Sequence, residues 1–459
     1  MLFRDTYFDA SKKTLASRKF DGTSSTPFDV VASPERNAAR ERARWINQNS
    51  GFMQNIDDTI VNNTIGDGLK LNSISRNNSF NIEIEELWNE FNTDYIDYYK
   101  ESNGVDIQRS LLMQRMVDGG VFEKITRSTS PKFPFSIQLV EVDNLDERNY
   151  LQNVDGYVAD GIVFSKSGMV RGYLFQQHKS HFWRDNRFTI NNPKFIKKNN
   201  NLIFFKRYDT PRSSQRREFT EYSRIVNDMK FFMSFQTSTV EAASARAKLI
   251  YTVESEAGMG FHNLDADTGQ KYEYIDGVYT RYLKSGEKLH VVDPAVAGTK
   301  YEEFHKNNLR QLAIGRGVSY ELAMRDASSA NFSSIRASII QDHKLFDYNQ
   351  MHMISHHLDI IFTKFVREMA LSGRLISTTP DDYILNEKDY QKHQWIAPAR
   401  SWVDPYKDIK ALVEKYNLGV ITLSDIAKSE GKDIADIIEQ KVKEDKMMRD
   451  AGLIKEEEK

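Results

Sequence analysis

The chain has 459 residues, a formal net charge of −2, 40% hydrophobic and 28% charged residues, and no cysteine. This length is enough for about two or three domains with a sizeable core, and the composition is that of a folded protein. The near-neutral charge argues against a dedicated nucleic-acid binder, and the lack of cysteine excludes disulfides, thiolate zinc sites and cysteine nucleophiles.

The N-terminal part of the chain is expected to be a loose arm followed by helices. Residues 1–33 are rich in Ser, Thr, Lys and Asp, and have no apolar run of signal-peptide length. Pro34 opens a helical pattern that ends at Gly66. Amphipathic patterns predict two more helices, over Ile82–Tyr99 and Ile107–Asp118. No stretch of about 18 consecutive apolar residues occurs anywhere, so no membrane span is expected.

From Gly119 to Phe205 the apolar period changes to that of strands, with turns at Asn153–Gly156 and Lys166–Gly168. This pattern predicts an antiparallel sheet packed on the preceding helices. The fold class is therefore α+β and helix-rich.

A long helical pattern without Pro or Gly follows from Glu218 to Val253. At 1.5 Å per residue it would span roughly 50 Å, longer than an ordinary domain helix. Its first half is aromatic and its second half is small and polar, which is typical of a helix crossing between two environments. Short strands and turns over Gly258–Gly298 predict a small β module, and Tyr301–Ile314 is helical again.

The stretch Leu309–Ile340 combines a helix break with a small polar loop. We expect the break at Gly315 and Gly317, then a short turn of helix, and Ser333 or Ser334 as the N-cap of the next helix. The loop residues are Asp326, Ala327, Ser328, Ser329, Ala330, Asn331, Phe332, Ser333 and Ser334. Small polar residues around one aromatic resist packing into a core, so the loop is a candidate working part.

The next helix is expected to run from Ser333 to Leu371 and to end at Gly373. The charged tail from Asp404 predicts two or three amphipathic helices.

No phosphate-binding loop motif is present, and Gly315-x-Gly317 lacks the third glycine of a dinucleotide fingerprint because Tyr320 stands there. His352 and His356 could meet on one helix face and bind zinc, but Met353 stands where a metalloprotease has its catalytic Glu. Ordinary packed histidines are the preferred interpretation.

Two charged clusters were weighed as sites. Glu141 and Asp143 alternate on an expected strand, so they share a face and could hold magnesium. Arg212, Arg216 and Arg217 could contact phosphate, although a solvated face is the default. Nothing assembles into a catalytic constellation, and no cofactor is expected.

The order of blocks along the chain resembles the lambda family of bacteriophage portal proteins, from about Asn37 to Ile438. An Arg-rich helix is followed by asparagines and Gly66-x-Gly68, and then come QLVEVDNLD and DGIVFSKSGMVRGYLF. The most specific block is GRGVSYELAMRDASSANFSSIRA, similar to the family's Gly-Val-Ser turn and Asn-Tyr-Ser-Ser-x-Arg, with Phe332 in place of the Tyr. One block departs: where the family has Arg-Gly-x-Ser, this chain has Arg-Arg-Glu-Phe from Arg216.

The resemblance implies a ring at one capsid vertex, typically of about twelve subunits, with a channel for double-stranded DNA. It implies a portal fold with these parts: N-terminal arm 1–33, wing 34–222, stem helix 223–253, clip 254–300, stem helix and turn 301–324, tunnel loop 325–334, long wing helix and wing 335–403, and crown 404–459. Gly315 and Gly317 would form a helix hinge, and Arg336 would contact the loop or a neighbouring subunit.

The implied partners are the terminase large subunit, a head-tail adaptor, and the major capsid and scaffolding proteins. The expected location is the virion, with assembly in the host cytoplasm. The expected role is structural and gating, without catalysis. The alternative is a metal-dependent DNA-processing enzyme, a nuclease that uses the histidines near His352 or the paired acids.

Overall fold

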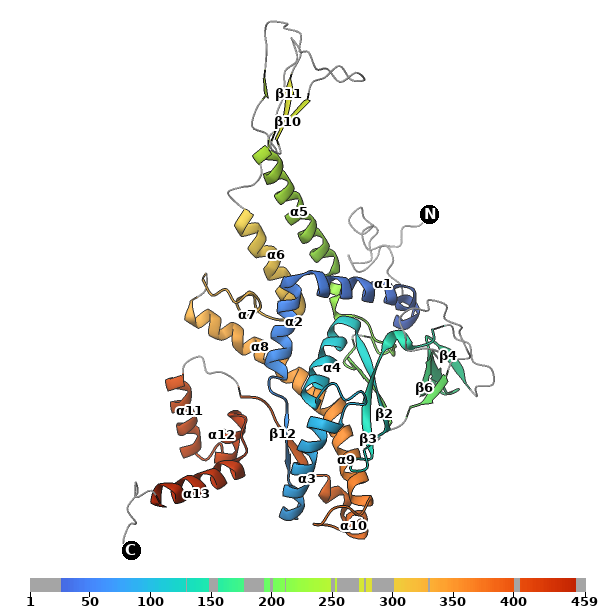
Figure 1. Ribbon diagram of the computed structural model, residues 1–459, viewed down its shortest axis with the longest axis vertical. Helices are drawn as coiled ribbons and strands as arrows, with labels where there is room; N and C mark the ends of the chain where they lie inside the picture. Colours follow the sequence, from blue (N-terminus) through green and yellow to red (C-terminus); the bar gives the residue numbers. More distant parts are fainter. Residues whose placement is uncertain are drawn as a thin grey trace, which may run out of the picture. The chain divides into compact units, whose positions relative to one another are not determined.

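The computed structural model describes residues 26–128, 130–147, 156–176, 194–198, 201–210, 212–248, 252–253, 272–275, 278–282, 301–328, 331–399 and 405–450. The chain divides into two compact units (Figure 1). The first unit comprises residues 1–223 and 343–459, and the second unit comprises residues 224–342. Among the described residues, no helix is long and apolar enough to cross a membrane.

The first unit begins with two helices, α1 (Phe28–Asn49) and α2 (Gly51–Thr64), where the sequence predicted one helix starting at Pro34. Pro34 instead lies inside α1. The earlier start is stabilised by distant residues: the Phe28 N–H donates to Ser214 Oγ (3.0 Å), and Asp29 accepts the N–H of Arg216 (2.7 Å). The expected arm is thus helical over its last residues, and residues 1–25 lie outside the described part.

Ser50 separates α1 from α2 because its backbone is extended, with φ −113° and ψ 107°. Its hydroxyl oxygen accepts the Met53 N–H at 3.3 Å and so caps α2.

The two predicted helices that follow are confirmed, with earlier starts. α3 (Asn78–Glu90) is capped by Asn77, whose Oδ1 accepts the Phe80 N–H at 3.2 Å, and it continues into a π-helical turn at Phe91–Tyr95. α4 (Gly104–Asp118) begins with a reciprocal capping box between Asn103 and Asp106.

The predicted antiparallel strands are confirmed, but they form two sheets (Figure 1). One sheet has the order β3-β2-β8, with strands Phe135–Glu141, Gly120–Arg127 and Leu202–Lys206. The other has the order β4-β5-β6-β7, with strands Tyr157–Ala159, Ile162–Phe164, Val170–Phe175 and Lys194–Lys197. A further antiparallel pair, β1 (Lys70–Ser73) with β12 (His393–Ile396), joins two segments far apart in the chain and was not foreseen.

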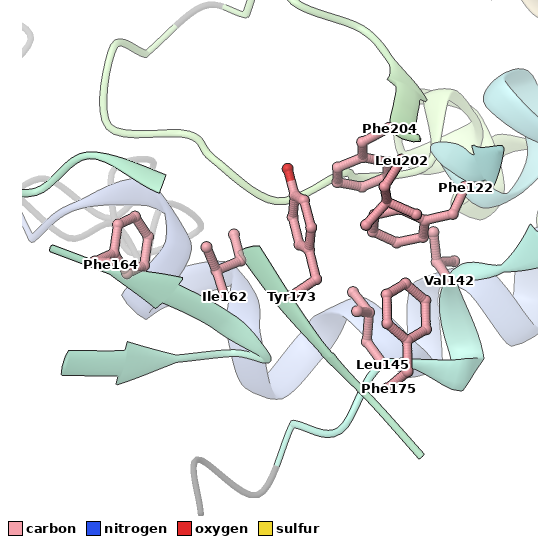
Figure 2. Close-up of a cluster of buried hydrophobic side chains, with 9 residues drawn as sticks. All are labelled: Phe122, Val142, Leu145, Ile162, Phe164, Tyr173, Phe175, Leu202 and Phe204. Atoms are coloured by element: carbon pink, nitrogen blue, oxygen red, sulfur yellow. The ribbon is translucent and has the colours of Figure 1, made fainter. Parts of the chain in front are cut away.

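Aromatic side chains from both larger sheets share one buried cluster (Figure 2). The ring of Phe122 on β2 stacks on Phe204 of β8, with centroids 4.1 Å apart. It also meets Tyr173 (4.9 Å) and Phe175 (5.0 Å) of β6 edge-on. Aromatic pairs in these arrangements add to the free energy of area burial, so this cluster fixes one sheet against the other.

The long helix predicted to follow the polar loop is confirmed with one irregularity. α8 (Phe332–Met353) and α9 (Asp359–Leu371) are joined by a π-helical turn over Ile354–Leu358. α10 (Pro380–Tyr390) follows, and the tail forms α11 (Pro405–Asn417), α12 (Leu423–Ser429) and α13 (Ile434–Asp450), as the charge pattern predicted.

In the second unit, α5 spans Val226–Lys248, so the start expected at Glu218 and the end expected at Val253 are both wrong. Its 23 residues correspond to about 35 Å. Thr252–Val253 forms strand β9, which pairs in parallel with β11 (Val278–Tyr282), and β11 pairs antiparallel with β10 (Tyr272–Ile275). These strands support the predicted β module, whose other residues lie outside the described part.

Glu218 cannot start a helix because it lies in a buried ion-pair network. Its carboxylate accepts from Arg217 Nε at 2.8 Å and from Arg40 Nη1 at 3.2 Å, while its backbone carbonyl accepts from Arg36 Nε at 3.2 Å. Arg217 is 0% and Glu218 2% exposed. Arg217 also binds Glu147 (3.1 Å) and donates to the backbone carbonyl of Asp160. The interpretation of Arg217 as part of a solvated or phosphate-binding cluster is therefore wrong.

Arg44, two turns after Arg36 on α1, extends the network. It binds Asp118 at the end of α4 (2.7 Å) and Asp143 (2.5 Å), and it lies 3.6 Å from Glu141. The expected alternation on one strand is wrong, because β3 ends at Glu141 and Asp143 lies in a 3-10 turn over Val142–Asn144. Both carboxylates lie near Arg44, which removes the reason to place magnesium between them.

We predict that Glu218→Gln destabilises the first unit by about 3–5 kcal/mol, because it leaves buried arginines without their carboxylate. Burial alone would raise the pKa of Glu218, but Arg217 and the arginines of α1 outweigh it and lower the pKa below the usual 4.5. A depressed carboxyl pKa stabilises the fold above the unfolded value, and that contribution is lost as the pH falls below about 4.5. Urea unfolding of wild type and Glu218→Gln between neutral and acidic pH should therefore show the difference shrinking with acidification. A difference that stays constant with pH would contradict this role.

Candidate functional site

The polar loop lies at the junction of α6 (Tyr301–Arg316), α7 (Tyr320–Met324) and α8, and the end of α6 is set by Gly317. Gly317 has φ 84°, a left-handed conformation that favours glycine. Its N–H donates to Ile314 O (2.9 Å), and the Val318 N–H reaches back to Ala313 O (3.1 Å), the pattern of a Schellman motif. The predicted break is thus confirmed at Gly317.

Gly315 has a different role, because it lies inside α6 and the break expected there is wrong. A Cβ at this position would lie 2.3 Å from Cγ2 of Ile225, which is 1% exposed and directly precedes α5. The glycine therefore allows α6 to approach the start of α5 closely. Whether the two glycines act as a hinge stays a prediction.

Ser319 fastens the start of α7 to α8. Its Oγ accepts the Leu322 N–H at 3.4 Å, and its own N–H and Oγ–H donate to the carboxylate of Asp342 at 2.9 and 2.5 Å. Asp342 is on α8 and only 3% exposed, so its negative charge is held by these hydrogen bonds in a buried place. The two helices on either side of the loop are thereby tied together.

The first part of the loop is ordered by Asp326. α7 ends at Arg325, whose φ is 54°, and the Asp326 carboxylate then accepts Ser328 N–H (3.0 Å), Ser328 Oγ–H (2.5 Å) and Tyr320 O–H (3.0 Å). The hydrogen bonds from Ser328, then that from Tyr320, lower the pKa of Asp326 to about 2. Burial and the same carboxylate raise the pKa of Tyr320. The guanidinium of Arg310 on α6 covers the Tyr320 ring at 5.2 Å.

Asn331 forms the other end of the loop. Its Oδ1 accepts the Ser334 N–H at 2.8 Å and caps α8, so the expectation of Ser333 or Ser334 as N-cap is wrong. Phe332, Ser333 and Ser334 lie in the first turn of α8. Ser329 and Ala330 are outside the described residues. Arg336 is half-buried on α8, and its predicted contact to the loop or a neighbour stays a prediction.

The exposed side chains of the loop and the first turn of α8 are small and mostly uncharged. They are Ala327, Ser328, Asn331, Ser333 and Ser334. Such a surface offers hydrogen bonds but no strong positive charge to grip phosphate. Arg325 and Asp326 at its start carry one charge of each sign.

His352 and His356, the pair considered for zinc, do meet, with ring centroids 4.5 Å apart, but both have protein partners. His352 Nε2 meets the carbonyl of Lys206 at 2.8 Å, and burial lowers the pKa of His352 to about 3, so its ring is neutral. His356 Nδ1 lies 3.2 Å from the backbone carbonyl of His352. The next residue, His357, has its Nδ1 2.6 Å from Glu123 Oε2 in the core. In the part of the chain that the structure describes, no group of three or more His, Asp or Glu could hold a metal ion.

Sequence reasoning missed three residues that shape the junction: Asp342, Tyr320 and Arg310. The sequence offered one signal: Ser319 stands directly before a short helical pattern and could be recognised as its N-cap. Its partner Asp342 is 23 residues further along, so no local rule could have identified it.

Comparison with known proteins now gives the family. The family described as "Phage portal protein, lambda family" matches residues 16–350. The chain belongs to the lambda family of phage portal proteins. It is 21% identical to portal protein B of Escherichia phage lambda, with 94% of this chain and 87% of the relative covered, and 21% identical to the portal protein of Escherichia phage N15 over 93% and 87%. It is also 23% identical to a probable portal protein of Halomonas phage phiHAP-1, over 94% and 85%.

A solved structure titled "Neck of native GTA particle computed with C12 symmetry" is similar over 84% of this portal protein and 92% of that chain. The TM-score is 0.40 and the identity 10%, too low to support an argument about fold. The family match therefore rests on sequence.

We predict that Gly315→Ala destabilises this portal protein by about 1–3 kcal/mol, because its methyl group would overlap Ile225. Helix propensity alone predicts the opposite sign, a gain of about 1 kcal/mol. In a double-mutant cycle of unfolding free energies, Gly315→Ala combined with Ile225→Ala should cost less than the sum of the single changes. Gly51→Ala is the matched control, since a Cβ there meets nothing within 4 Å. Stabilisation by Gly315→Ala would show that packing does not require the glycine.

Proposed function

We propose that this portal protein forms a ring of about twelve copies at one vertex of a phage capsid, and that DNA is packaged and ejected through its channel. The observation that carries the proposal is the family membership combined with a small polar loop, held between ordered helix ends, in which Arg325 and Asp326 carry one charge of each sign. The location would be the virion, after assembly in the host cytoplasm.

Exposed apolar side chains on α5 and α6 support the ring. Phe231 is 72%, Val240 67%, Phe304 45% and Ile314 71% exposed in the single chain. Large exposed apolar side chains on neighbouring helices are typical of an interaction surface. In a closed ring each copy meets the next through two different surfaces, so these side chains would be covered by neighbouring copies.

The loop supports low-friction passage of DNA. Each phosphate neutralised by a Lys or Arg strengthens binding, and a ring repeats every such contact in each copy. Ser328 and Asn331 can form hydrogen bonds that exchange with water, whereas a ring of arginines would slow the DNA. Asp326 and Asn331 hold the two ends of the loop in place.

The remaining parts follow the family arrangement as a proposal. The wing would be residues 34–222 with 335–403, and α1 extends it back to Phe28. The stem would be α5 and α6, the clip residues 254–300, the tunnel loop residues 325–334 and the crown residues 404–459. The clip would meet the terminase large subunit and the head-tail adaptor, and the wing the major capsid and scaffolding proteins.

The alternative, a metal-dependent nuclease, has little support. Its candidate ligands have other partners: His352 meets the backbone carbonyl of Lys206, His356 that of His352, and the Glu141–Asp143 pair meets Arg44. Magnesium-dependent cleavage of DNA by the purified protein would favour it over a purely structural role.

We predict that Phe231→Asp or Ile314→Asp prevents ring assembly, because a carboxylate cannot be buried in an apolar interface without a partner. Light scattering and negative-stain images should show rings for wild type and monomers for the variants. Leu385→Asp is the control: this side chain is 82% exposed but lies on α10. Rings formed equally well by all variants would contradict the assignment of α5 and α6 to subunit contacts.

We also predict that Ser328→Arg leaves ring assembly intact but slows DNA packaging by about tenfold or more at low salt, since it places a ring of positive charges on the channel wall. Raising the salt concentration should restore much of the rate. Ser328→Gln, polar but neutral, should package normally. Equal rates for Ser328→Arg and Ser328→Gln at low salt would place the loop away from DNA.

A further inference from the structure

A groove of about 1570 Å³ lies in the first unit, and none of its lining residues belongs to the polar loop. It is lined by residues of β6, β8 and the segment after β8 on one side, and by residues of α9 and α10 on the other. Leu202, Phe204, Ile360 and Leu371 contribute apolar surface. The groove thus combines apolar and charged lining, as binding sites for peptide segments do.

The carboxylates that line the groove are already bound by neighbouring residues. Asp209 accepts from Arg207 (2.8 Å), Asp359 from His393 (2.9 Å) and Trp395 (2.8 Å). Glu368 pairs with Lys364 at 3.2 Å, and Glu387 accepts from Gln391 at 3.1 Å. Each of these four carboxylates therefore already has a hydrogen-bond or ion-pair partner within the chain.

Lys206 is different, because its ammonium lines the groove without a carboxylate partner. The residue is 7% exposed, and among the described residues no Asp or Glu oxygen comes within ion-pair distance of its Nζ. Its Nζ lies over the rings of Tyr208 and Phe204, 5.1 and 5.8 Å from their centroids. Burial lowers the pKa of Lys206 to about 8, so a proton is held there at some cost in free energy.

More basic groups line the same groove. Lys198, Arg216 and Arg367 are exposed, and no Asp or Glu in the described ranges of the chain comes within ion-pair distance of them. The acidic groups of the groove are thus engaged by hydrogen-bond donors, whereas four basic side chains of the groove have no acidic partner in the part of the chain that the structure describes. A ligand that brings carboxylates would bind these groups and stabilise the charge of Lys206.

We propose that this groove binds an acidic peptide segment of a partner protein, with one side-chain carboxylate seated on Lys206. A peptide is favoured over DNA for two reasons. Apolar lining from Leu202, Phe204 and Ile360 suits apolar side chains between the acidic ones, and Lys206 is too deeply buried to meet the phosphates of an intact duplex. The inference concerns residues other than those of the polar loop and does not depend on ring formation.

The test is fluorescence anisotropy of the full chain with a fluorescein-labelled peptide of alternating Glu and Leu. We expect wild type to bind this peptide and Lys206→Met to bind it about tenfold or more weakly, since a charge-assisted contact is lost. Lys206→Arg, which keeps the charge, should retain part of the binding. Lys197→Met is the matched control: Lys197 is an exposed lysine on neighbouring β7 and does not line the groove.

Substitution of Met for a buried lysine is not expected to unfold the chain, because it removes a costly charge and keeps an unbranched side chain. A second measurement uses the native lysine: acetylation of Lys206 by an N-hydroxysuccinimide ester, followed by mass spectrometry, should decrease when the Glu-Leu peptide is present. A Gln-Leu peptide should give neither binding nor protection.

Three outcomes would overturn the proposal: no binding of the Glu-Leu peptide, equal binding by Lys206→Met and wild type, or equal binding of the Gln-Leu peptide. Displacement of the peptide by a DNA duplex whose own binding also requires Lys206 would assign the groove to nucleic acid instead.

Discussion

Arg217 and Glu218 form a buried ion pair on which the packing of the first unit depends. Two buried charges are costly unless each is fully engaged, and here Arg36 and Arg40 of α1 complete the set. The network therefore fixes the middle of α1 against the segment before Thr220. Glu218 lies in this network outside any helix, and α5 begins at Val226.

The helices around the polar loop are also held by charged groups, but here neutral hydrogen-bond donors, and not arginines, engage the carboxylates. Asp342 and Asp326 are carboxylates held by hydroxyl and N–H donors from Ser319, Ser328 and Tyr320. Hydrogen bonds to a charged acceptor are stronger than neutral ones. Asp326 therefore fixes the start of the loop, and Asp342 holds the start of α7 on α8. With Asn331 closing the far end, the loop can carry small, weakly interacting residues without fraying the helices beside it. In the DNA channel proposed above, positioning and weak contact would both be required, and they belong to different residues.

Much of the architecture was predictable because it depends on local pattern. The strands between Gly119 and Phe205, the helix at Tyr301 and the helices of the tail all have clear periodicity, and the structure contains them. The errors lie at element ends. Pro34 was taken as a helix start, although Asp29 is held by Arg216 from far along the chain. Gly315 was taken as a break, although it is a contact to Ile225. Neither partner is within reach of a local rule.

The sequence by itself determined the class of fold, the order of the elements, the family and the polar character of the loop, because these depend on composition and on spacing within short segments. Only the tertiary structure decided which charges are buried, since that depends on partners distant in the chain. Arg217 and the Glu141–Asp143 pair were taken as possible binding groups and are internal ion pairs. Lys206 gave no signal in the sequence, because the groove that it lines is built from segments distant in the chain, including β8 and α9.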